Sequence, residues 1–316
     1  MAIAVPKRSR STQNRGPGPK PRKDAGAFLR ETRRNLTAYG FLIGAVLCFA
    51  LFSWYPMIRE FFTSFQKVQG GHATWDGLHN LKQIVNDPSF GVAWRNTGEF
   101  TLLALVFGYA VPFFVAIVLN ELRHAKSYLR VVVYIPVMVP PVASLLLFQY
   151  FYNPQYGLFD DILHALHLPT STWLQNPSLA MFCVVLASTW MNMGGAVLIY
   201  LAALQGIPGE LYEAAELDGA GIIRRIWHVT IPQTRLILSL MLLLQIVATM
   251  QVFVEPFVLT GGQGVNNSTT TIVYLIYQYA FNFNNYGAAS ALGLVLLLVL
   301  AVFSALYVRV SRAAEQ

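Results

Sequence analysis

Charged residues are scarce in this sequence. Asp, Glu, Lys and Arg make up 12% of the 316 residues, whereas hydrophobic residues make up 55%. Soluble domains usually contain about 25% charged residues, so this composition excludes an ordinary soluble protein. The formal net charge of +7 does not indicate nucleic-acid binding, because ten of the 22 Lys and Arg residues fall within the first 34 positions, beside a hydrophobic run. The composition is typical of a membrane protein.

Cysteine and clustered metal ligands are also nearly absent. The two cysteines, Cys48 and Cys183, each lie inside a hydrophobic run, where cysteine behaves as a small apolar residue. His164 and His167 are three residues apart and close to two aspartates, but a solvated helix face explains this spacing better than a metal site. We therefore expect no disulfide framework, no metal and no cofactor on this chain.

Nucleotide-binding and catalytic motifs are missing as well. The sequence contains no Gly-rich phosphate loop ending in Gly-Lys-Ser/Thr, so nothing in it would cradle ATP phosphates. The apolar runs hold almost no titratable residues, which argues against a membrane-embedded enzyme. An ion-coupled secondary transporter remains an alternative, although midplane coupling groups and repeated halves are not evident.

The first 36 residues differ in composition from the rest. They mix Pro, Gly, Ser, Lys and Arg without apolar periodicity, which predicts a disordered basic tail. The run after Tyr39 is about 20 residues long, enough to span about 30 Å of hydrocarbon, and so predicts a retained helix instead of a cleaved signal peptide. Residues 37–312 are then one membrane domain.

Long runs with few or no charges predict the architecture. None shows the sustained alternation of a membrane barrel strand, so the fold class is an all-α integral membrane protein with six transmembrane helices. The predicted spans are Tyr39 to Ile58, Phe100 to Leu119, Val131 to Tyr152, Leu179 to Leu204, Leu236 to Val258 and Gly287 to Val308.

The positions of Lys and Arg predict the orientation. With the N-terminus in the cytoplasm, 18 of the 22 fall in the tail or in inner segments, and the outer segments 153–178 and 260–286 contain none. Both termini are therefore expected to be cytoplasmic. Pro136, Pro140 and Pro141 predict that the third span kinks or unwinds, either for helix packing or to line a cavity.

The only long connection on the predicted cytoplasmic side is the loop 205–235. Pro208 suits a helix start and Asp218-Gly219 a helix stop, which predicts a helix from about Pro208 to Leu217. A second short helix is predicted from about Ile222, ending before Pro232. The apolar residues of these helices exceed what so small an element buries, so the loop either docks on another protein or lies on the membrane surface.

This loop resembles a known motif. Glu213-Ala214-Ala215, three residues, Gly219, nine residues and Val229-Thr230-Ile231-Pro232 is similar to the EAA loop of binding-protein-dependent ABC importer permeases. The family usually has Ile and Leu at the positions of Val229 and Ile231. The segments around Asn80 and Asn96-Thr97, and Leu259 to Gly262 with Asn267 to Thr269, resemble its carbohydrate-uptake branch.

The resemblance implies a function and an assembly. It implies a permease subunit in the bacterial inner membrane that forms half of a path for a sugar or oligosaccharide, with a second permease subunit, two ATP-binding subunits that use ATP and Mg, and an extracytoplasmic solute-binding protein. It also implies ATPase coupling by one set of loop residues: Glu213, Ala214, Ala215, Asp218, Gly219 and Pro232.

The substrate path is expected on the fourth and fifth spans. Asn192 lies about 20 Å into the fourth span, near the bilayer middle, where an amide faces either a cavity or another helix. The expected path residues are Trp190, Met191, Asn192, Thr249, Gln251 and Phe253. The absence of Lys and Arg from the span interiors favours a neutral sugar over glycerol phosphate. Glu255, before Pro256, is expected to reach toward the outer interface.

Overall fold

The computed structural model describes residues 35, 39–69, 72–122 and 126–314. The chain divides into two units, residues 1–58 and 59–316. Apart from Asn35, the predicted tail lies outside the described residues. In the first unit the chain is helical from Tyr39 and includes the π-helical turn η1 (Ala50–Trp54), after which α2 (Tyr55–Thr63) begins. This helix belongs to a candidate membrane span, Tyr39–Thr63.

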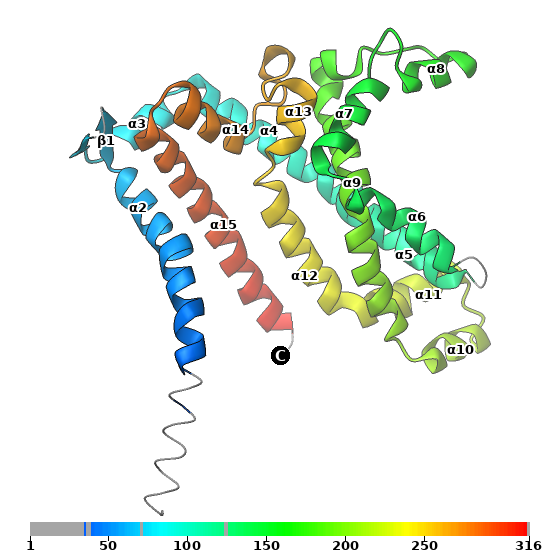
Figure 1. Cartoon of the computed structure of the whole chain (residues 1–316). Helices are drawn as coiled ribbons and strands as arrows, with labels where there is room; N and C mark the ends of the chain where they lie inside the picture. Colours follow the sequence, from blue (N-terminus) through cyan, green and yellow to red (C-terminus); the bar gives the residue numbers. More distant parts are fainter. Residues whose placement is uncertain (1–34, 36–38, 70–71, 123–125, 315–316) are drawn as a thin grey trace, which may run out of the picture. The chain divides into compact units, whose positions relative to one another are not determined.

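Long apolar helices dominate the second unit (Figure 1). Asp87 and Asn176 each begin one of them with a side-chain cap followed by proline at the first helical position. Across the described residues, five helices are long and apolar enough to cross a membrane, or six if one bent pair is a single span. The long helices of this unit are α4–η2–α5 (Pro88–Ala104, Leu105–Ala110, Val111–Glu121), α9 (Pro177–Gln205), α11–η4–α12 (Ile222–Arg225, Ile226–Thr230, Ile231–Thr249) and α15 (Tyr286–Ala314).

The bent pair is the predicted third span. It consists of α6 (Lys126–Met138) and α7 (Pro141–Phe151), which meet at an angle of 97°. Pro140 precedes α7 with φ −53° and ψ 132°, a conformation that ends one helix before the next begins. The proline-induced break expected from the sequence is confirmed, and it is sharper than a kink.

Short elements complete the second unit. A two-stranded antiparallel hairpin pairs Gln66 with Trp75 and Gln69 with His72. His164 lies on α8, and the described residues contain no group of three or more His, Cys, Asp or Glu side chains arranged to hold a metal. These elements are β1 (Gln66–Gln69), β2 (His72–Trp75), α3 (His79–Val85), α8 (Leu158–Ala165), η3 (Trp173–Gln175), α10 (Gly209–Leu217), α13 (Val254–Thr260), η5 (Val265–Asn267), α14 (Ile272–Tyr277) and η6 (Gln278–Asn282).

Helix α9 occupies the centre of the packing. One buried cluster joins it to α4 and α7, and a second joins it to α5 and the segment 226–241. Gly194 lets α6 approach closely, because a Cβ at this position would lie 2.6 Å from the Val133 carbonyl oxygen. A third cluster packs α15 against α3 and α14.

The second helix of the loop extends beyond its predicted end. It does not end before Pro232, since the chain stays helical from Ile222 to Thr249. The π-turn η4 ends at Thr230, so that Pro232 falls in the first turn of α12, where its missing N–H is tolerated. The same arrangement of a π-turn followed by proline occurs at η2 and Pro112.

The fifth span is also shorter than predicted. Helix α12 ends at Thr249 instead of Val258, and α13 begins at Val254 after a break. Phe253 has φ −141° and ψ −52°, which is not helical. The freed Val252 carbonyl accepts a hydrogen bond of 3.1 Å from Thr271 Oγ1, so a neighbouring segment satisfies the break.

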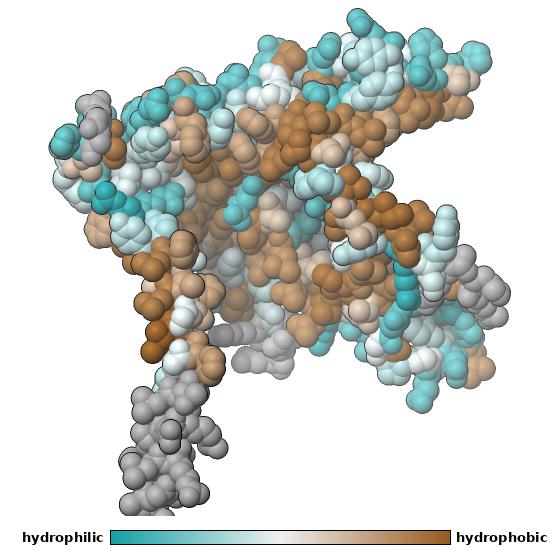
Figure 2. All heavy atoms as spheres, in the orientation of Figure 1, coloured by the Kyte–Doolittle hydropathy of each residue, from teal (hydrophilic) through white to brown (hydrophobic). Residues whose placement is uncertain are grey.

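The ends of the long helices differ in surface chemistry from their middle parts. Helices α10 and α11 lie at one end of α9 and α12, here called the α10 end, and α13 and α14 lie at the other, the α14 end (Figure 1). Figure 2 shows hydrophobic surface over the long helices and hydrophilic surface around α8 and α10. Exposed apolar residues along one helix, such as Leu102, Val106, Phe114 and Val118, are those expected to meet lipid or another subunit.

Candidate functional site

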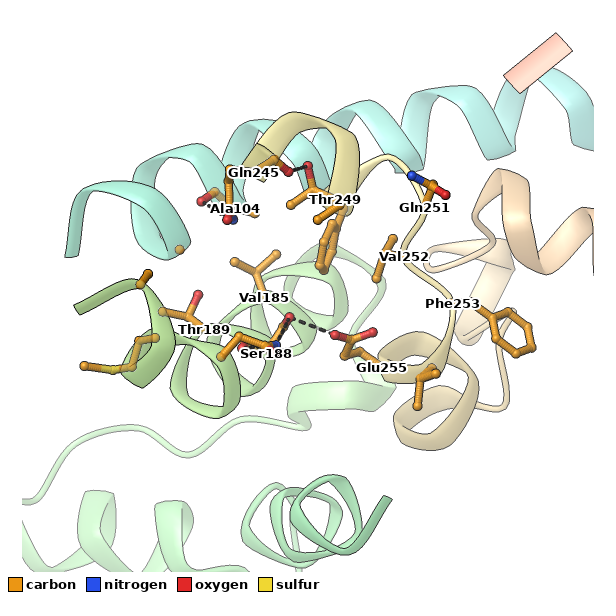
Figure 3. Close-up of a pocket in the computed structure, with 17 residues that line it drawn as sticks. Ala104, Val185, Ser188, Thr189, Gln245, Thr249, Gln251, Val252, Phe253 and Glu255 are labelled. Atoms are coloured by element: carbon orange, nitrogen blue, oxygen red, sulfur yellow. Dashed lines mark hydrogen bonds between the residues drawn. The ribbon is translucent and has the colours of Figure 1, made fainter. Parts of the chain in front are cut away.

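A cavity of about 340 Å³ lies among α4, α9, α12 and α13 (Figure 3). Its wall includes residues of the break after α12, so the interruption of the fifth span shapes the cavity. The lining residues are Phe100, Ala104, Gly108, Val185, Ser188, Thr189, Asn192, Met193, Ala196, Gln245, Ala248, Thr249, Gln251, Val252, Phe253, Val254 and Glu255. Hydroxyl and amide groups thus share the wall with small and apolar side chains, as in many ligand pockets.

Three polar residues form a connected group on the wall. Ser188 Oγ donates a 3.0 Å hydrogen bond to Glu255 Oε1 (Figure 3). Asn192 Nδ2 donates to the Ser188 carbonyl oxygen at 2.9 Å, one turn away on the same helix. The helical spacing of four residues places Ser188 and Asn192 on one face of α9, opposite the start of α13.

The opposite wall carries the end of α12. Thr249 Oγ1 donates to the Gln245 carbonyl oxygen at 2.8 Å, and Gln251 Nε2 donates to the Val247 carbonyl oxygen at 2.9 Å. Gln245 Nε2 lies 3.5 Å from the Ala104 carbonyl oxygen, at the start of the π-turn η2. These bonds leave the side-chain oxygens of Gln245 and Gln251 available to a ligand.

The cavity contains four of the six residues predicted for the path. Asn192, Thr249, Gln251 and Phe253 line it, whereas Trp190 and Met191 do not. Successive residues of a helix point about 100° apart, so Trp190 and Met191 leave the face that Asn192 occupies. Trp190 packs edge-on against Phe148 with ring centroids 5.3 Å apart, and Met191 is buried in the core.

Glu255 lies in the cavity wall. Its reach toward an outer interface stays a prediction, whereas the unbroken helix expected through Val258 is wrong, because a separate helix begins at Val254. Pro256 is the third residue of α13, a first-turn position, and such a proline is itself a signal that a new helix begins just upstream. Gln245 and Ser188 are further polar lining residues that the sequence prediction did not select.

The segment 261–285 at the α14 end holds this break in place through buried polar contacts. Asn96 is fully buried, and its Nδ2 donates to the carbonyl oxygens of Asn267 at 2.7 Å and Thr270 at 3.0 Å. Thr97 Oγ1 accepts from the Ile272 amide at 3.0 Å. Helix α4, which also lines the cavity, is thereby joined to the segment that supports Val252.

The predicted coupling loop has a defined structure at the α10 end. Helix α10 ends as expected, with Gly219 in the left-handed region at φ +73°. The Gly219 amide donates to the Glu216 carbonyl and the Ala220 amide donates to the Ala215 carbonyl, each at 2.9 Å, the pattern of a Schellman motif. The helix itself begins at Gly209, one residue later than predicted, with Pro208 as its cap.

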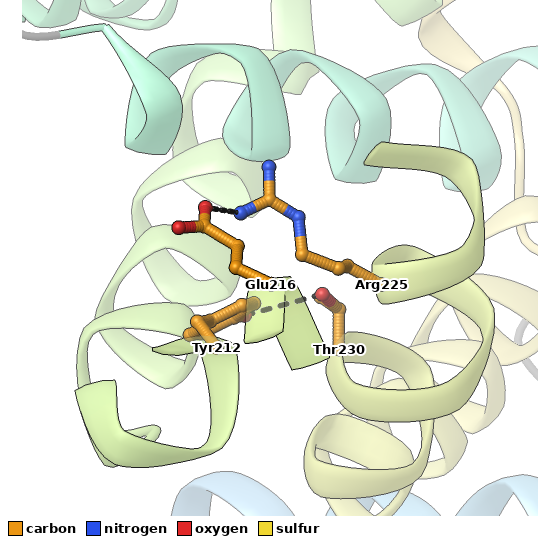
Figure 4. Close-up of polar contacts among 4 residues, drawn as sticks. All are labelled: Tyr212, Glu216, Arg225 and Thr230. Carbon is orange, nitrogen blue, oxygen red and sulfur yellow. Dashed lines mark hydrogen bonds and ion pairs between the residues drawn. The ribbon is translucent and has the colours of Figure 1, made fainter. Parts of the chain in front are cut away.

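Two side-chain contacts join α10 to the following helix (Figure 4). The Tyr212 and Thr230 hydroxyls lie 3.1 Å apart, and Arg225 forms an ion pair with Glu216. Within the described ranges this is the only ion pair between side chains. Helix α10 is therefore held against the start of α11–η4–α12, the helix that reaches the cavity.

Most of the coupling-loop surface stays exposed. Leu217 is 90% exposed and Ile223 is 74% exposed, although both are large and apolar. Among the predicted coupling residues, Glu213, Ala214, Asp218, Gly219 and Pro232 are exposed, and Ala215 is half-buried. These exposed apolar side chains leave open both readings of the loop, contact with another protein or with the membrane surface.

Comparisons with known proteins identify similar chains. The family described as "Binding-protein-dependent transport system inner membrane component" matches residues 108–316. The arabinooligosaccharides transport system permease protein AraP of Bacillus subtilis is 32% identical over 88% of this chain and 89% of its own length. The trehalose/maltose transport system permease protein MalF of Thermococcus litoralis is 33% identical over 75% of this chain and 79% of its own.

A solved structure shares the fold. A chain of a bacterial ABC transporter involved in the import of the acidic polysaccharide alginate superposes with a TM-score of 0.81 and 24% identity, covering 92% of this chain and 99% of that one. At this identity the likeness shows the fold alone. The helical architecture of this chain therefore also occurs in a chain of an ABC transporter.

Proposed function

This chain belongs to the family of inner-membrane components of binding-protein-dependent transport systems, and we propose that it is a permease subunit that forms half of a sugar translocation path. The observation that carries the proposal is the cavity between α9, α12 and α13. Its polar groups are hydroxyls, amides and one carboxyl, and its lining contains no Lys, Arg or His among the described residues. Such groups form hydrogen bonds with the hydroxyls of a neutral sugar.

The names of the relatives support a carbohydrate substrate. AraP and MalF are named for transport of arabinooligosaccharides and of trehalose or maltose. A cavity of about 340 Å³ lies at the small end of the range for ligand pockets, which fits a wall completed by a second permease subunit. Asn192 and Thr249 are the proposed contacts from α9 and α12, with Gln251 and Phe253 at the break.

A second part of the proposal concerns the coupling loop. We infer that α10 and the start of α11 dock on an ATP-binding subunit, in which ATP and Mg are used. The exposed apolar residues Leu217 and Ile223 supply the contact area, and Ala214 allows close approach of a partner surface. Because α11–η4–α12 is one continuous helix, movement of the loop would be transmitted to Thr249 at the cavity.

The orientation follows from the same proposal. The segments at the α10 end include Arg130, Arg224, Arg225, Arg235 and Arg309, which supports a cytoplasmic location for this end by the positive-inside rule. The α14 end then faces the outside, where an extracytoplasmic solute-binding protein would deliver the substrate. Both termini would be cytoplasmic.

Another solute is the alternative to be tested. Glycerol phosphate would require a cationic contact, and the described cavity offers none, so the second permease subunit would have to provide it. Uptake assays with a radiolabelled neutral oligosaccharide and with glycerol 3-phosphate, using the complete transporter in proteoliposomes, distinguish the two. Transport of glycerol 3-phosphate alone would refute the sugar assignment.

The coupling role is tested with Glu213→Lys and Gly219→Asp in the complete transporter. Uptake and substrate-stimulated ATPase activity are expected to fall at least tenfold while the chain still inserts in the membrane. Asp161→Lys is the matched control, because Asp161 is an exposed acidic residue on α8 at the opposite end. Unchanged ATPase stimulation in both loop variants would refute the coupling role.

A further inference from the structure

The cavity wall contains a single charged side chain among the described residues. Glu255 lines the cavity, and no Lys, Arg or His shares the wall with it. The one side-chain ion pair within the described ranges joins Arg225 to Glu216 at the α10 end and does not involve Glu255. The charge of Glu255 is thus not neutralised by a neighbouring cation in this part of the structure.

The carboxyl group is fixed in position on one side and open on the other. Ser188 Oγ donates to Oε1 at 3.0 Å, which orients the group toward the face of α9 that carries Asn192 (Figure 3). No described residue forms a hydrogen bond with Oε2. A half-buried carboxylate with a free oxygen is a strong acceptor, and hydrogen bonds from hydroxyls to an ionised carboxylate are shorter and stronger than neutral ones.

The local backbone places this group in the path. Because the chain breaks between Thr249 and Val254, the first turn of α13 turns Glu255 into the wall. An unbroken helix would have placed it elsewhere, and Thr271 Oγ1 stabilises the break by donating to the Val252 carbonyl at 3.1 Å. Thr271, which does not line the cavity, therefore helps to fix the position of the Glu255 carboxyl group.

We propose that Glu255 is the charge filter of the translocation path: it accepts hydrogen bonds from the hydroxyls of a neutral sugar and rejects anionic sugars. This inference rests on the proposed function of the cavity. A fixed negative charge repels an anion, and this repulsion adds selectivity against anions to the hydrogen bonds that the carboxylate accepts from sugar hydroxyls. The substrate class is thereby narrowed to polyhydroxyl compounds without a negative charge.

The experiment measures charge selectivity directly and needs no knowledge of the sugar. Cys48→Ala and Cys183→Ala remove the native thiols, and Ala248→Cys adds one at an exposed, cavity-lining position. The complete transporter in membrane vesicles is treated with methanethiosulfonate reagents bearing a trimethylammonium, a sulfonate or a neutral hydroxyl group. The chain is then isolated, and its modification rate is measured by mass spectrometry.

The comparison is made between Glu255 and Glu255→Gln in this background. The amide keeps the size of the side chain and an oxygen that accepts from Ser188. We expect the ratio of cationic to anionic modification rates to fall about tenfold in the Glu255→Gln variant, because position 248 and Glu255 line the same cavity. The rate with the neutral reagent should stay the same, which would show that the shape of the cavity is retained.

Glu99→Gln is the matched control. Glu99 is exposed on α4 and does not line the cavity, so the same loss of charge there should leave the ratio unchanged. If Glu255→Gln does not change the ratio while the thiol still reacts, the charge filter is refuted and the proposed path stands. If no reagent modifies Ala248→Cys in any background, the path itself is refuted, and the filter falls with it.

Discussion

The segment 261–285 at the α14 end and the predicted coupling loop 205–235 at the α10 end connect long helices of the same unit, yet they differ in how far their side chains are buried (Figure 1). In the α14-end segment Thr269, Thr271 and Ile272 are fully buried, and Asn96 and Thr97 of α4 form hydrogen bonds with its backbone. In the predicted coupling loop, α10 has no buried residue at all.

This difference indicates which contacts stabilise each segment. The α14-end segment is ordered by contacts within the chain, so it keeps its shape without a partner. The predicted coupling loop is ordered locally, by the Schellman motif at Gly219 and the contacts of Tyr212 and Arg225, while its apolar side chains remain exposed. A loop of this kind presents a preformed surface, which lowers the entropic cost of binding.

The largest expected effect on stability comes from Asn96→Ala. In this variant the buried Thr270 carbonyl loses its Asn96 donor, and the Asn267 carbonyl keeps only the Thr270 amide, at 3.4 Å. The free energy of unfolding should fall by about 2 kcal/mol, since an unsatisfied buried group costs about 1–3 kcal/mol. Denaturant titration in detergent micelles measures the change. Asn192→Ala is the control, because its exposed amide bonds only to its own helix, and it should change stability by less than about 0.5 kcal/mol.

A smaller loss of stability is expected from Gly219→Ala in the predicted coupling loop. Gly219 adopts φ +73°, and a side chain with a Cβ costs about 1 kcal/mol in this region. Gly219→Asn should cost less, since Asn tolerates the left-handed conformation better than Ala. Thermal unfolding of the purified chain ranks the stability of the parent, the Gly219→Asn variant and the Gly219→Ala variant. An Ala variant as stable as the parent would show that this turn is not maintained in solution.

The pH dependence of the contact between Asp87, at the start of α4, and Tyr279 of the α14-end segment offers a third test. Burial alone would raise the pKa of Asp87, but hydrogen bonds from Tyr279 Oη at 2.5 Å and from the Ser89 amide at 2.8 Å outweigh it and hold this pKa below its ordinary value. A lowered folded-state pKa stabilises the protein above the ordinary pKa of an aspartate, about 3.9, and this contribution disappears as the pH falls through the folded value.

Asp87→Asn isolates that contribution. The variant should be less stable than the parent at neutral pH, and the difference should shrink progressively as the pH falls below about 4. The matched control is Asp161→Asn, an exposed aspartate on α8. Unfolding curves collected between neutral pH and pH 3 provide the measurement, and a pH-independent difference would contradict the assignment.

The sequence predicted those parts of the fold that depend on local chemistry. Pro208 and Asp218-Gly219 marked the ends of α10 to within one residue, and the three prolines of the third span marked its break. The family resemblance carried by the EAA motif is confirmed by the match over residues 108–316. The roles of Glu213 to Gly219 and of Asn192 and Thr249 stay predictions.

The parts that the sequence did not predict depend on distant contacts. The break after Thr249 contains neither glycine nor proline, and it is supported by Thr271, which is distant in the sequence. Pro232 continues a helix because the π-turn η4 precedes it, a feature of backbone hydrogen bonding that composition does not reveal. For the first of these reasons the sequence did not show that Glu255 lies in the first turn of a separate helix and lines the cavity.

The smallest effect on stability is expected from Ile223→Ser, a variant that should mainly weaken binding of the ATP-binding subunit. Ile223 is 74% exposed, so Ile223→Ser should change the unfolding free energy of the isolated chain by less than about 0.5 kcal/mol. If Ile223 enters a pocket on the ATP-binding subunit, the same variant should weaken that contact by about 1–3 kcal/mol, roughly tenfold or more in affinity.

The control for this variant is Leu102→Ser, which is also exposed but lies on α4 and should leave the affinity unchanged. Binding is measured by capture of the purified ATP-binding subunit on the immobilised permease complex. Equal capture by both variants would show that the exposed apolar face at the α10 end serves another contact. The contrast between the two connecting segments would then lose its functional meaning, because a preformed apolar surface matters for coupling only if the ATP-binding subunit covers it.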